Sequence, residues 1–376
     1  SQIWKDLSHD IYKNSYVGMY CVGCEEFKTE AHVKETNNIC PLHNRVYDKV
    51  EEENYFFRLS KYNDQLKKLI ESGEFNIVPK ARRNEILGVI NEGLEDISIS
   101  RNAEKISWGI PVPGDKSQVM YVWFEALMNY ITTLGYPDGE DFKKFWPADM
   151  QVIGKDILRF HAAIWPAMLL SLGLELPKTI YVHGFVTSNG EKMSKSLGNV
   201  VDPIEVVDKY GLDAFRYYIF RHGPAADDVD FTWDKFEAAY NNELANELGN
   251  AVSRVSAMIT KYQNGVIGDT PESNHDSGAY HDAIADCRFD KALEAVWDQV
   301  RGLNQYIEEE KPWQIAKEKD EIHLQEVLAE AAGSLMEIAE LLEPFLPGTA
   351  EKIQYVFSEG VIRPLDETSL FPKHEN

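Results

Sequence analysis

The chain has 376 residues, of which 44% are hydrophobic and 27% are charged, an ordinary globular balance with enough apolar material for two or three cores. It contains no run of eighteen apolar residues and no apolar targeting segment, and four cysteines are too few for a secreted disulfide scaffold; we therefore expect a cytoplasmic protein without membrane contact. The net charge of −24 argues against nucleic acid as a partner, so any RNA contact must use local basic and aromatic groups.

The first hundred residues combine turns with two expected helices. Residues 18–50 are turn-rich and hold three of the four cysteines. Apolar side chains recur every three to four positions over 54–72, which predicts an amphipathic helix. A second helix is expected over 82–94, followed by a short strand at 97–100.

Strands and helices alternate in the middle of the chain, after a loop marked by two prolines and a glycine at 111–114. This alternation predicts a parallel sheet of the doubly wound, Rossmann type. The expected strands are 119–123, 150–154 and 179–183, and the expected helices are one that runs through Tyr130 and one over about 155–172.

Beyond about residue 230 the strand signal nearly disappears. Apolar residues recur with helical periodicity over 235–262, 281–311 and 323–343, and the last of these segments carries one continuous apolar stripe. Three such segments predict an all-helical bundle.

Three cysteines and one histidine lie in two short chelating turns. Cys21 and Cys24 frame the first turn, and Cys40 and His43 frame the second after fifteen intervening residues. This spacing predicts one structural zinc ion per chain, because three thiolates and one imidazole fill a tetrahedral shell and leave no position open for chemistry. The alternatives are three free cysteines that happen to lie near a histidine, and His32 as a competing ligand.

A loop with two lysines follows the turn 188–190. Lys192 and Lys195 flank Met193 and Ser194, and a mobile cationic loop of this kind can fold over a triphosphate and neutralise charge that builds up at the α-phosphorus. The alternative is a solvated basic turn. The full pentapeptide Lys-Met-Ser-Lys-Ser is the signature of class I aminoacyl-tRNA synthetases.

Between residues 21 and 313 the chain resembles the methionyl-tRNA synthetases. The motifs that carry the resemblance, besides the lysine loop, are 52–57, 97–101, 121–127, 153–161 and 248–254. The resemblance implies an α/β plus all-α fold: the C-terminal half of a Rossmann-type parallel sheet with a zinc-binding insertion, and then an α-helical bundle that binds the anticodon. The implied domains are the insertion at 1–101 with its zinc knuckle at about 18–47, the half-sheet at 102–183, the lysine loop and stem-contact region at 184–230, and the helical domain at 231–376.

The resemblance implies a pocket for the methionine side chain. In the family, the matching positions that form it are Trp123, Tyr130, Ile157, His161 and Trp165. The last three are spaced four residues apart, so they would share one helix face, and aromatic edges suit a polarisable thioether. The alternative for such an aromatic stripe is plain core packing.

The resemblance also implies an ATP site, with Mg²⁺ accompanying the nucleotide. The matching positions are Gly154, His183, Gly184 and the loop residues Lys192, Met193, Ser194 and Lys195. The catalytic residues would be the two lysines and Asp156, a polar residue near the amino acid and the ribose, which by its position also suits a helix cap.

In the helical part, Asn250, Arg254 and Trp313 match the family positions that recognise the CAU anticodon. Asn250 and Arg254 are four residues apart and would bond base edges, while Trp313 would stack on an unstacked base. The alternatives are a hydrogen-bonding role for Asn250 inside the helix and a core role for Trp313.

The family's other catalytic signature, His-Ile-Gly-His, does not occur in this sequence, which opens like a chain entered in mid-helix. We therefore expect a fragment whose N-terminal half comes from the intact enzyme or from a second piece, and we expect residues 1–376 alone not to form methionyl-adenylate. No C-terminal dimerisation extension is visible, so the expected state is a monomer.

The expected function is that of a methionine–tRNA ligase with ATP, L-methionine and tRNA(Met) as partners. Methionine would attack the α-phosphate of Mg-ATP, and the terminal ribose of the tRNA would then attack the adenylate carbonyl, with catalysis by positioning and charge stabilisation. The short insertion leaves little room for an editing domain. Two alternatives stay open: another class I synthetase, such as a leucyl or cysteinyl enzyme, and a non-catalytic fragment that binds tRNA or protein.

Overall fold

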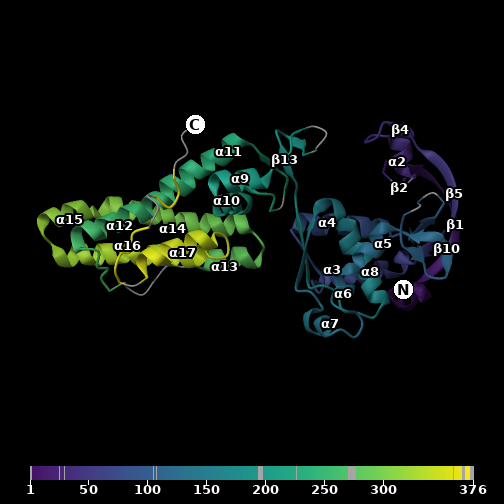
Figure 1. Cartoon of the computed structure of the whole chain (residues 1–376). Helices are drawn as coiled ribbons and strands as arrows, with labels where there is room; N and C mark the ends of the chain where they lie inside the picture. The colour runs from purple at the N-terminus through teal and green to yellow at the C-terminus, as the bar shows by residue number, and fades with distance from the viewer. Residues whose placement is uncertain are drawn as a thin grey trace. The chain divides into compact units, whose positions relative to one another are not determined.

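The computed structural model describes residues 2–24, 26–28, 30–104, 106, 108–193, 198–225, 227–269, 277–358, 360–365 and 369–372 (Figure 1). Two compact units divide the chain, Ser1–Val182 and His183–Asn376, and each has its own hydrophobic core. The first unit mixes strands with helices and the second is mainly helical, which confirms the predicted α/β plus all-α class. Among the helices of these described ranges, none combines the length and the apolarity needed to cross a bilayer.

A long antiparallel strand pair dominates the first part of the N-terminal unit, after helix α1 (Gln2–Asp6). β1 (Ile11–Cys21) pairs with β5 (Asp48–Phe57) from Ile11 opposite Phe57 to Tyr20 opposite Asp48. The segment between the two strands forms a small knuckle at their far end. Its elements are β2 (Glu26–Lys28), α2 (Glu30–Glu35), β3 (Ile39–Cys40) and β4 (Arg45–Val46).

The helix predicted over 54–72 is wrong in its first part, because residues 54–57 belong to β5. Asn54 is fully buried although it is polar, so the alternation of inward and outward side chains along this strand is hidden in the sequence. The helix itself, α3 (Asn63–Ser72), starts after a 3-10 turn and ends at Gly73, whose φ of 83° is the left-handed conformation that glycine adopts readily.

A three-stranded sheet in the order β11-β12-β6 carries the Rossmann-type part of this unit. β12 runs parallel to β6, with Ile180 opposite Ile77. The sequence predicted β11 and β12 but not β6, because three residues are too few to show a period. The elements around this sheet are β6 (Asn76–Val78), α4 (Lys80–Glu92), β11 (Met150–Gly154), β12 (Thr179–His183), α5 (Val122–Leu127), α6 (Asn129–Thr132) and α7 (Glu140–Phe145).

The single regular helix expected over 155–172 is also wrong in detail. The segment begins with a 3-10 turn (Lys155–Ile157), continues through a π-helical turn (Phe160–Ile164) and becomes regular only in α8 (Trp165–Ser171). The predicted strand at 119–123 is displaced as well, since β10 (Asp115–Met120) starts earlier and ends inside the predicted range, and α5 already contains Trp123. β10 forms a small antiparallel sheet with β8 (Ser100–Asn102) and β9 (Pro111–Val112).

The C-terminal unit starts with a small sheet in the order β14-β13-β15, in which β13 pairs antiparallel with β14 and parallel with β15. Helix α11 passes through the π-helical segment Tyr240–Gly249 into α12 without a break in the helical assignment. Figure 1 shows α12, α14, α16 and α17 lying alongside one another around the core of this unit. The strands are β13 (Val186–Ser188), β14 (Glu191–Lys192) and β15 (Val229–Phe231), and the helices named here are α11 (Trp233–Ala239), α12 (Asn250–Gln263), α14 (Phe289–Glu310), α16 (Glu321–Leu342) and α17 (Pro347–Phe357).

The three helical segments predicted after residue 230 are confirmed, with a break at Asp286–Arg288 inside the second. Several shorter helices were not predicted, because two or three turns give too few repeats for a periodic signal. These are α9 (Pro203–Tyr210), α10 (Leu212–His222), α15 (Pro312–Glu318) and α17, and the break separates α13 (Gly278–Ala285) from α14.

Candidate functional site

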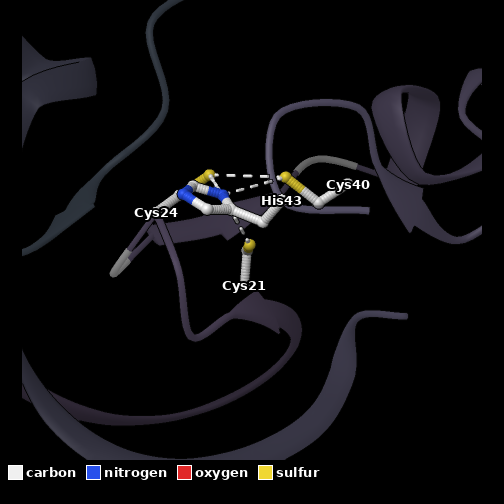
Figure 2. A group of neighbouring side chains, drawn as sticks. All are labelled: Cys21, Cys24, Cys40 and His43. Carbon is white, nitrogen blue, oxygen red and sulfur yellow. Dashed lines mark hydrogen bonds between the residues drawn. The ribbon is translucent and has the colours of Figure 1, made fainter. Parts of the chain in front are cut away.

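The four predicted metal ligands meet at the tip of the knuckle (Figure 2). Cys21 ends β1, Cys40 ends β3, and Cys24 and His43 lie in the turns that follow. The Nδ1 atom of His43 lies 3.4 Å from the sulfur of Cys24, 3.5 Å from that of Cys40 and 3.9 Å from that of Cys21. The sulfurs of Cys24 and Cys40 are 3.5 Å apart.

These distances fit a tetrahedral zinc shell. Donors about 2.3 Å (sulfur) and about 2.0–2.1 Å (nitrogen) from one zinc ion at tetrahedral angles lie about 3.6–3.8 Å from each other. All four ligand atoms of the cluster lie within 4.8 Å of one another. The competing ligand His32 is not one of the four, and its ring centroid lies 6.2 Å from that of Tyr47.

The local backbone suits this cluster, and the thiols change one another's ionisation in opposite directions. A Cβ atom on Gly23 would lie 2.5 Å from Cγ of His43, so the first turn can close over the imidazole only with glycine at this position. Burial raises the pKa of the Cys40 thiol, but hydrogen bonds from His43 and the two other cysteines outweigh it and lower the pKa to about 6. Burial, with hydrogen bonds to Cys21 and Cys40, raises the pKa of Cys24 to about 12.

In the N-terminal unit, the side chain of Tyr130 contacts the side chains of two other predicted pocket residues, His161 and Trp165. The hydroxyl of Tyr130 lies 3.0 Å from Nε2 of His161, and the rings of Tyr130 and Trp165 are 5.9 Å apart. Nδ1 of His161 donates to the carbonyl of Ile157 at 3.0 Å, so Nε2 is the acceptor for the tyrosine hydroxyl. The indole N–H of Trp165 is buried and has no hydrogen-bond partner among the described residues.

Trp123 contacts the helical segment that contains His161, but its contact is with the neighbouring residue Phe160. Its ring stacks on Phe160 with a centroid distance of 4.4 Å and an interplanar angle of 19°. A cavity of about 490 Å³ opens beside it, and the described residues that line this cavity include Trp123 but none of the Tyr130–His161–Trp165 group. The structure therefore divides the predicted pocket into a packed aromatic group and a separate hollow.

The pKa of His161 is lowered from its usual 6.5, because burial disfavours the charged imidazole. The unfolded chain therefore binds this proton more readily than the folded one, so the stabilisation is complete above the unfolded pKa and is lost as pH falls below it. We expect the thermal midpoint of the protein to fall between about pH 7 and about pH 5, and to fall less in a His161→Gln variant. His281→Gln, at an exposed histidine of the other unit, is the control; equal pH dependence of all three proteins would contradict the assignment.

The candidate nucleotide residues belong to both units. Gly154 ends β11, and Asp156 lies in the 3-10 turn that follows. The N-cap residue of this turn is Gly154, so the capping role expected for Asp156 is wrong. In the C-terminal unit, Nδ1 of His183 donates to the carbonyl of Gly184 at 2.7 Å. A Cβ on Gly184 would lie 2.4 Å from the carbonyl oxygen of Asp227, so only glycine fits there.

The lysine loop emerges from the hairpin of β13 and β14. Lys192 ends β14, and its ammonium lies 5.1 Å from the centre of the Phe185 ring. Met193 packs partly buried against the core of this unit. Ser194 and Lys195 lie outside the described residues. On the far side of the loop, the side-chain amide of Asn199 donates to the carbonyl of Lys192 at 3.3 Å, so the base of the loop is closed.

The anticodon candidates lie at one end of the helical bundle. Asn250, exposed, and Arg254 are one turn apart on α12, and the guanidinium of Arg254 lies 5.9 Å from the Trp313 ring of α15. Arg254 also forms an ion pair of 2.7 Å with Glu308 of α14. Trp313 is partly buried against the core.

Sequence reasoning assigned no role to several residues that the fold brings to these places. Arg101 lines the 490 Å³ cavity and lies 4.4 Å from the Tyr121 ring, although both belong to motifs that the sequence analysis singled out. Phe160 could have been found as the neighbour of His161. Glu308 carries no local signal, because it lies 54 residues from Arg254.

Comparison with known proteins gives a consistent result. The family model "tRNA synthetases class I (M)" matches residues 36–256. The chain is 42% identical to the methionine–tRNA ligase of Thermotoga maritima over 92% of its own length and 57% of that protein. It is 44% identical to that of Caldanaerobacter subterraneus subsp. tengcongensis, over 92% and 56%. The crystal structure of Mycobacterium tuberculosis methionyl-tRNA synthetase bound by methionyl-adenylate superimposes with a TM-score of 0.85 and 33% identity, over 99% of this chain and 80% of that one. The chain thus spans little more than half the length of these curated relatives.

Proposed function

The chain belongs to the methionyl-tRNA synthetase family of class I tRNA synthetases, and from this membership we propose that it is the part of a methionine–tRNA ligase that holds the methionine pocket, the lysine loop and the anticodon-binding helices. The observation that carries the proposal is the closed hairpin base from which Lys192 enters the Lys-Met-Ser-Lys-Ser loop. Further support is the likeness to an enzyme whose crystal structure holds methionyl-adenylate.

The reaction proposed for the complete enzyme has two steps. The methionine carboxylate attacks the α-phosphorus of Mg-ATP in line, which forms methionyl-adenylate and releases pyrophosphate. The terminal ribose hydroxyl of tRNA(Met) then attacks the adenylate carbonyl and releases AMP. Lys192 and Lys195 stabilise the charge that builds up on the phosphates, and Asp156, Gly154, His183 and Gly184 line the nucleotide and amino-acid site.

Specificity for methionine is assigned to Trp123, Tyr130, Ile157, His161 and Trp165. Burial keeps His161 neutral, and its Nε2 is engaged by Tyr130, so the group offers aromatic faces and no net charge to a side chain that has none. A thioether is polarisable and packs well against aromatic rings, whereas a charged side chain would lose its hydration there.

The Cys21, Cys24, Cys40 and His43 cluster is proposed to hold one structural zinc ion. The support is the donor set, its spacing and the imidazole–thiol distances of 3.4–3.9 Å. When bound, the ion would cross-link the two turns of the knuckle. A cytoplasmic location and a monomeric state stay predictions, and sedimentation of the purified chain tests the latter.

Residues 1–376 alone are expected to show no methionine-dependent exchange of pyrophosphate into ATP. His-Ile-Gly-His, the family's other catalytic signature, is absent from this sequence, so ATP would meet only part of its binding residues. The test compares residues 1–376 with the same chain completed by a nucleotide-binding half that carries His-Ile-Gly-His. The proposal is supported if the completed enzyme catalyses pyrophosphate exchange and residues 1–376 do not. Exchange by residues 1–376 alone contradicts the incomplete site, and no exchange by either contradicts the proposed activity.

Trp313→Ala is expected to weaken binding of a CAU-anticodon stem-loop by about tenfold or more, since stacking of one base on an aromatic ring contributes about 1–3 kcal/mol. The matched control is Tyr355→Ala, which removes an exposed aromatic ring that has an arginine, Arg363, 5.3 Å from its centre. Filter binding measures both variants. Equal affinity of the Trp313 variant and the unsubstituted chain would leave Trp313 with a packing role only.

A further inference from the structure

A short hairpin turn supports the lysine loop. Asn189 and Gly190 connect β13 to β14 with φ values of 53° and 78°, the left-handed pair that a two-residue hairpin turn requires. In this hairpin Ser188 lies opposite Glu191, and Thr187 lies opposite Lys192. Lys192 is therefore two residues from the turn, on the strand that leaves it.

Asp230, from the neighbouring strand β15, binds this turn through one oxygen. The backbone N–H of Gly190 donates to its Oδ1 at 2.7 Å, and the hydroxyl of Thr187 donates to the same atom at 2.9 Å. The hydrogen bond from Gly190 lowers the pKa of the Asp230 carboxyl, which is therefore ionised at neutral pH. The other oxygen, Oδ2, lies 3.5 Å from the ammonium of Lys235 in the first turn of α11.

The two hydrogen bonds to Asp230 are additional to those that a two-residue hairpin needs for its own stability. A two-residue turn closes on its own ladder hydrogen bonds and requires no outside acceptor. Here a carboxylate forty residues away in sequence accepts both from the tip of the turn and from the strand that leads into it. A charge-assisted bond of this kind is shorter and stronger than a neutral one.

From these contacts we propose that Asp230 is a positioning residue for the lysine loop: it holds the Gly190 turn so that Lys192 is presented to the nucleotide from a fixed base. This inference rests on the proposed function of the loop. A lysine that stabilises a transition state is most effective when its support is already in place before the reaction, because no reorganisation is then needed. Asn199, which donates to the carbonyl of Lys192, holds the other side of the same base.

The proposal predicts a graded response at one position. In Asp230→Asn the amide oxygen can still accept from Gly190 and Thr187, whereas in Asp230→Ala no acceptor remains. In the completed enzyme, Asp230→Ala is expected to lower kcat of methionine-dependent pyrophosphate exchange about tenfold, with the KM for methionine unchanged, and Asp230→Asn to lower it about threefold or less. The control Asp234→Asn removes the same charge at an exposed residue of α11 and should match the unsubstituted enzyme.

Hydrogen exchange tests the contact independently of activity. In residues 1–376, Asp230→Ala should speed exchange of the Gly190 amide while the amides of β15 and α12 keep their protection. Unchanged exchange at Gly190, a general loss of protection across the unit, or equal kcat values for the Ala, Asn and control variants would overturn the inference. If the completed enzyme shows no pyrophosphate exchange at all, the proposed function fails. Hydrogen exchange at the Gly190 amide then still decides whether Asp230 anchors the turn.

Discussion

Replacing Lys192 and Lys195 together by alanine is expected to slow methionine-dependent pyrophosphate exchange by the completed enzyme at least about a thousandfold, because a preorganised donor aimed at developing charge contributes about a hundredfold to a thousandfold by itself. The loss should lie in kcat. The proposed methionine pocket does not use these lysines, so the KM for methionine should stay the same. Pre-steady-state measurement of adenylate formation separates this effect from slow product release.

The control for the lysine double variant removes two positive charges from the same unit. Lys261 and Lys317 are exposed lysines on α12 and α15, and their joint replacement by alanine changes the net charge equally. Exchange does not require tRNA, so this control should be fully active. A double loop variant that kept more than about a tenth of the activity would assign Lys192 and Lys195 to a solvated turn.

Cys24→Ser is expected to reduce the zinc content of the purified chain from one equivalent to none and to unfold the knuckle at about 18–47. Among the described residues of the knuckle, the buried cluster consists of Cys21, Cys40 and Tyr47, two of which are proposed metal ligands. Binding of a structural zinc ion contributes about 10 kcal/mol or more to the folding of such a small unit. The main core of the N-terminal unit contains none of these residues and should stay folded.

Metal analysis together with hydrogen exchange measures this outcome. His32→Ala is the matched control, because it removes a histidine of the same knuckle that lies outside the four-residue cluster. Gly23→Ala should weaken metal binding without removing a ligand, since the added Cβ would lie 2.5 Å from the His43 ring. Retention of a full zinc equivalent by Cys24→Ser, or loss of zinc from the His32 variant alone, would contradict the assigned ligand set.

An ion pair joins Arg254, one of the anticodon candidates, to Glu308, a residue that the family resemblance did not point to. The carboxylate of Glu308 lies 2.7 Å from the guanidinium of Arg254. The same guanidinium lies 5.9 Å from the centre of the Trp313 ring. An RNA base that bonds to Arg254 must share or displace this carboxylate.

Short-range spacing was enough to predict several parts of this protein. The two chelating turns, the lysine loop and the long helices α14 and α16 each depend on residues within one or a few turns of each other, so their signals are local. The general α/β plus all-α class followed from the order of these signals along the chain.

Contacts between segments far apart in the sequence could not be predicted from it and are seen only in the folded chain. Residues 54–57 form a strand because β1 pairs with them, and this pairing outweighs a local helical period. Trp123 stacks on Phe160 rather than joining the Tyr130–His161–Trp165 group, and Asp230 binds a turn forty residues before it. A hydrogen bond or ring contact across such a separation leaves no period in the sequence, since its partners are brought together only by the packing of whole strands and helices.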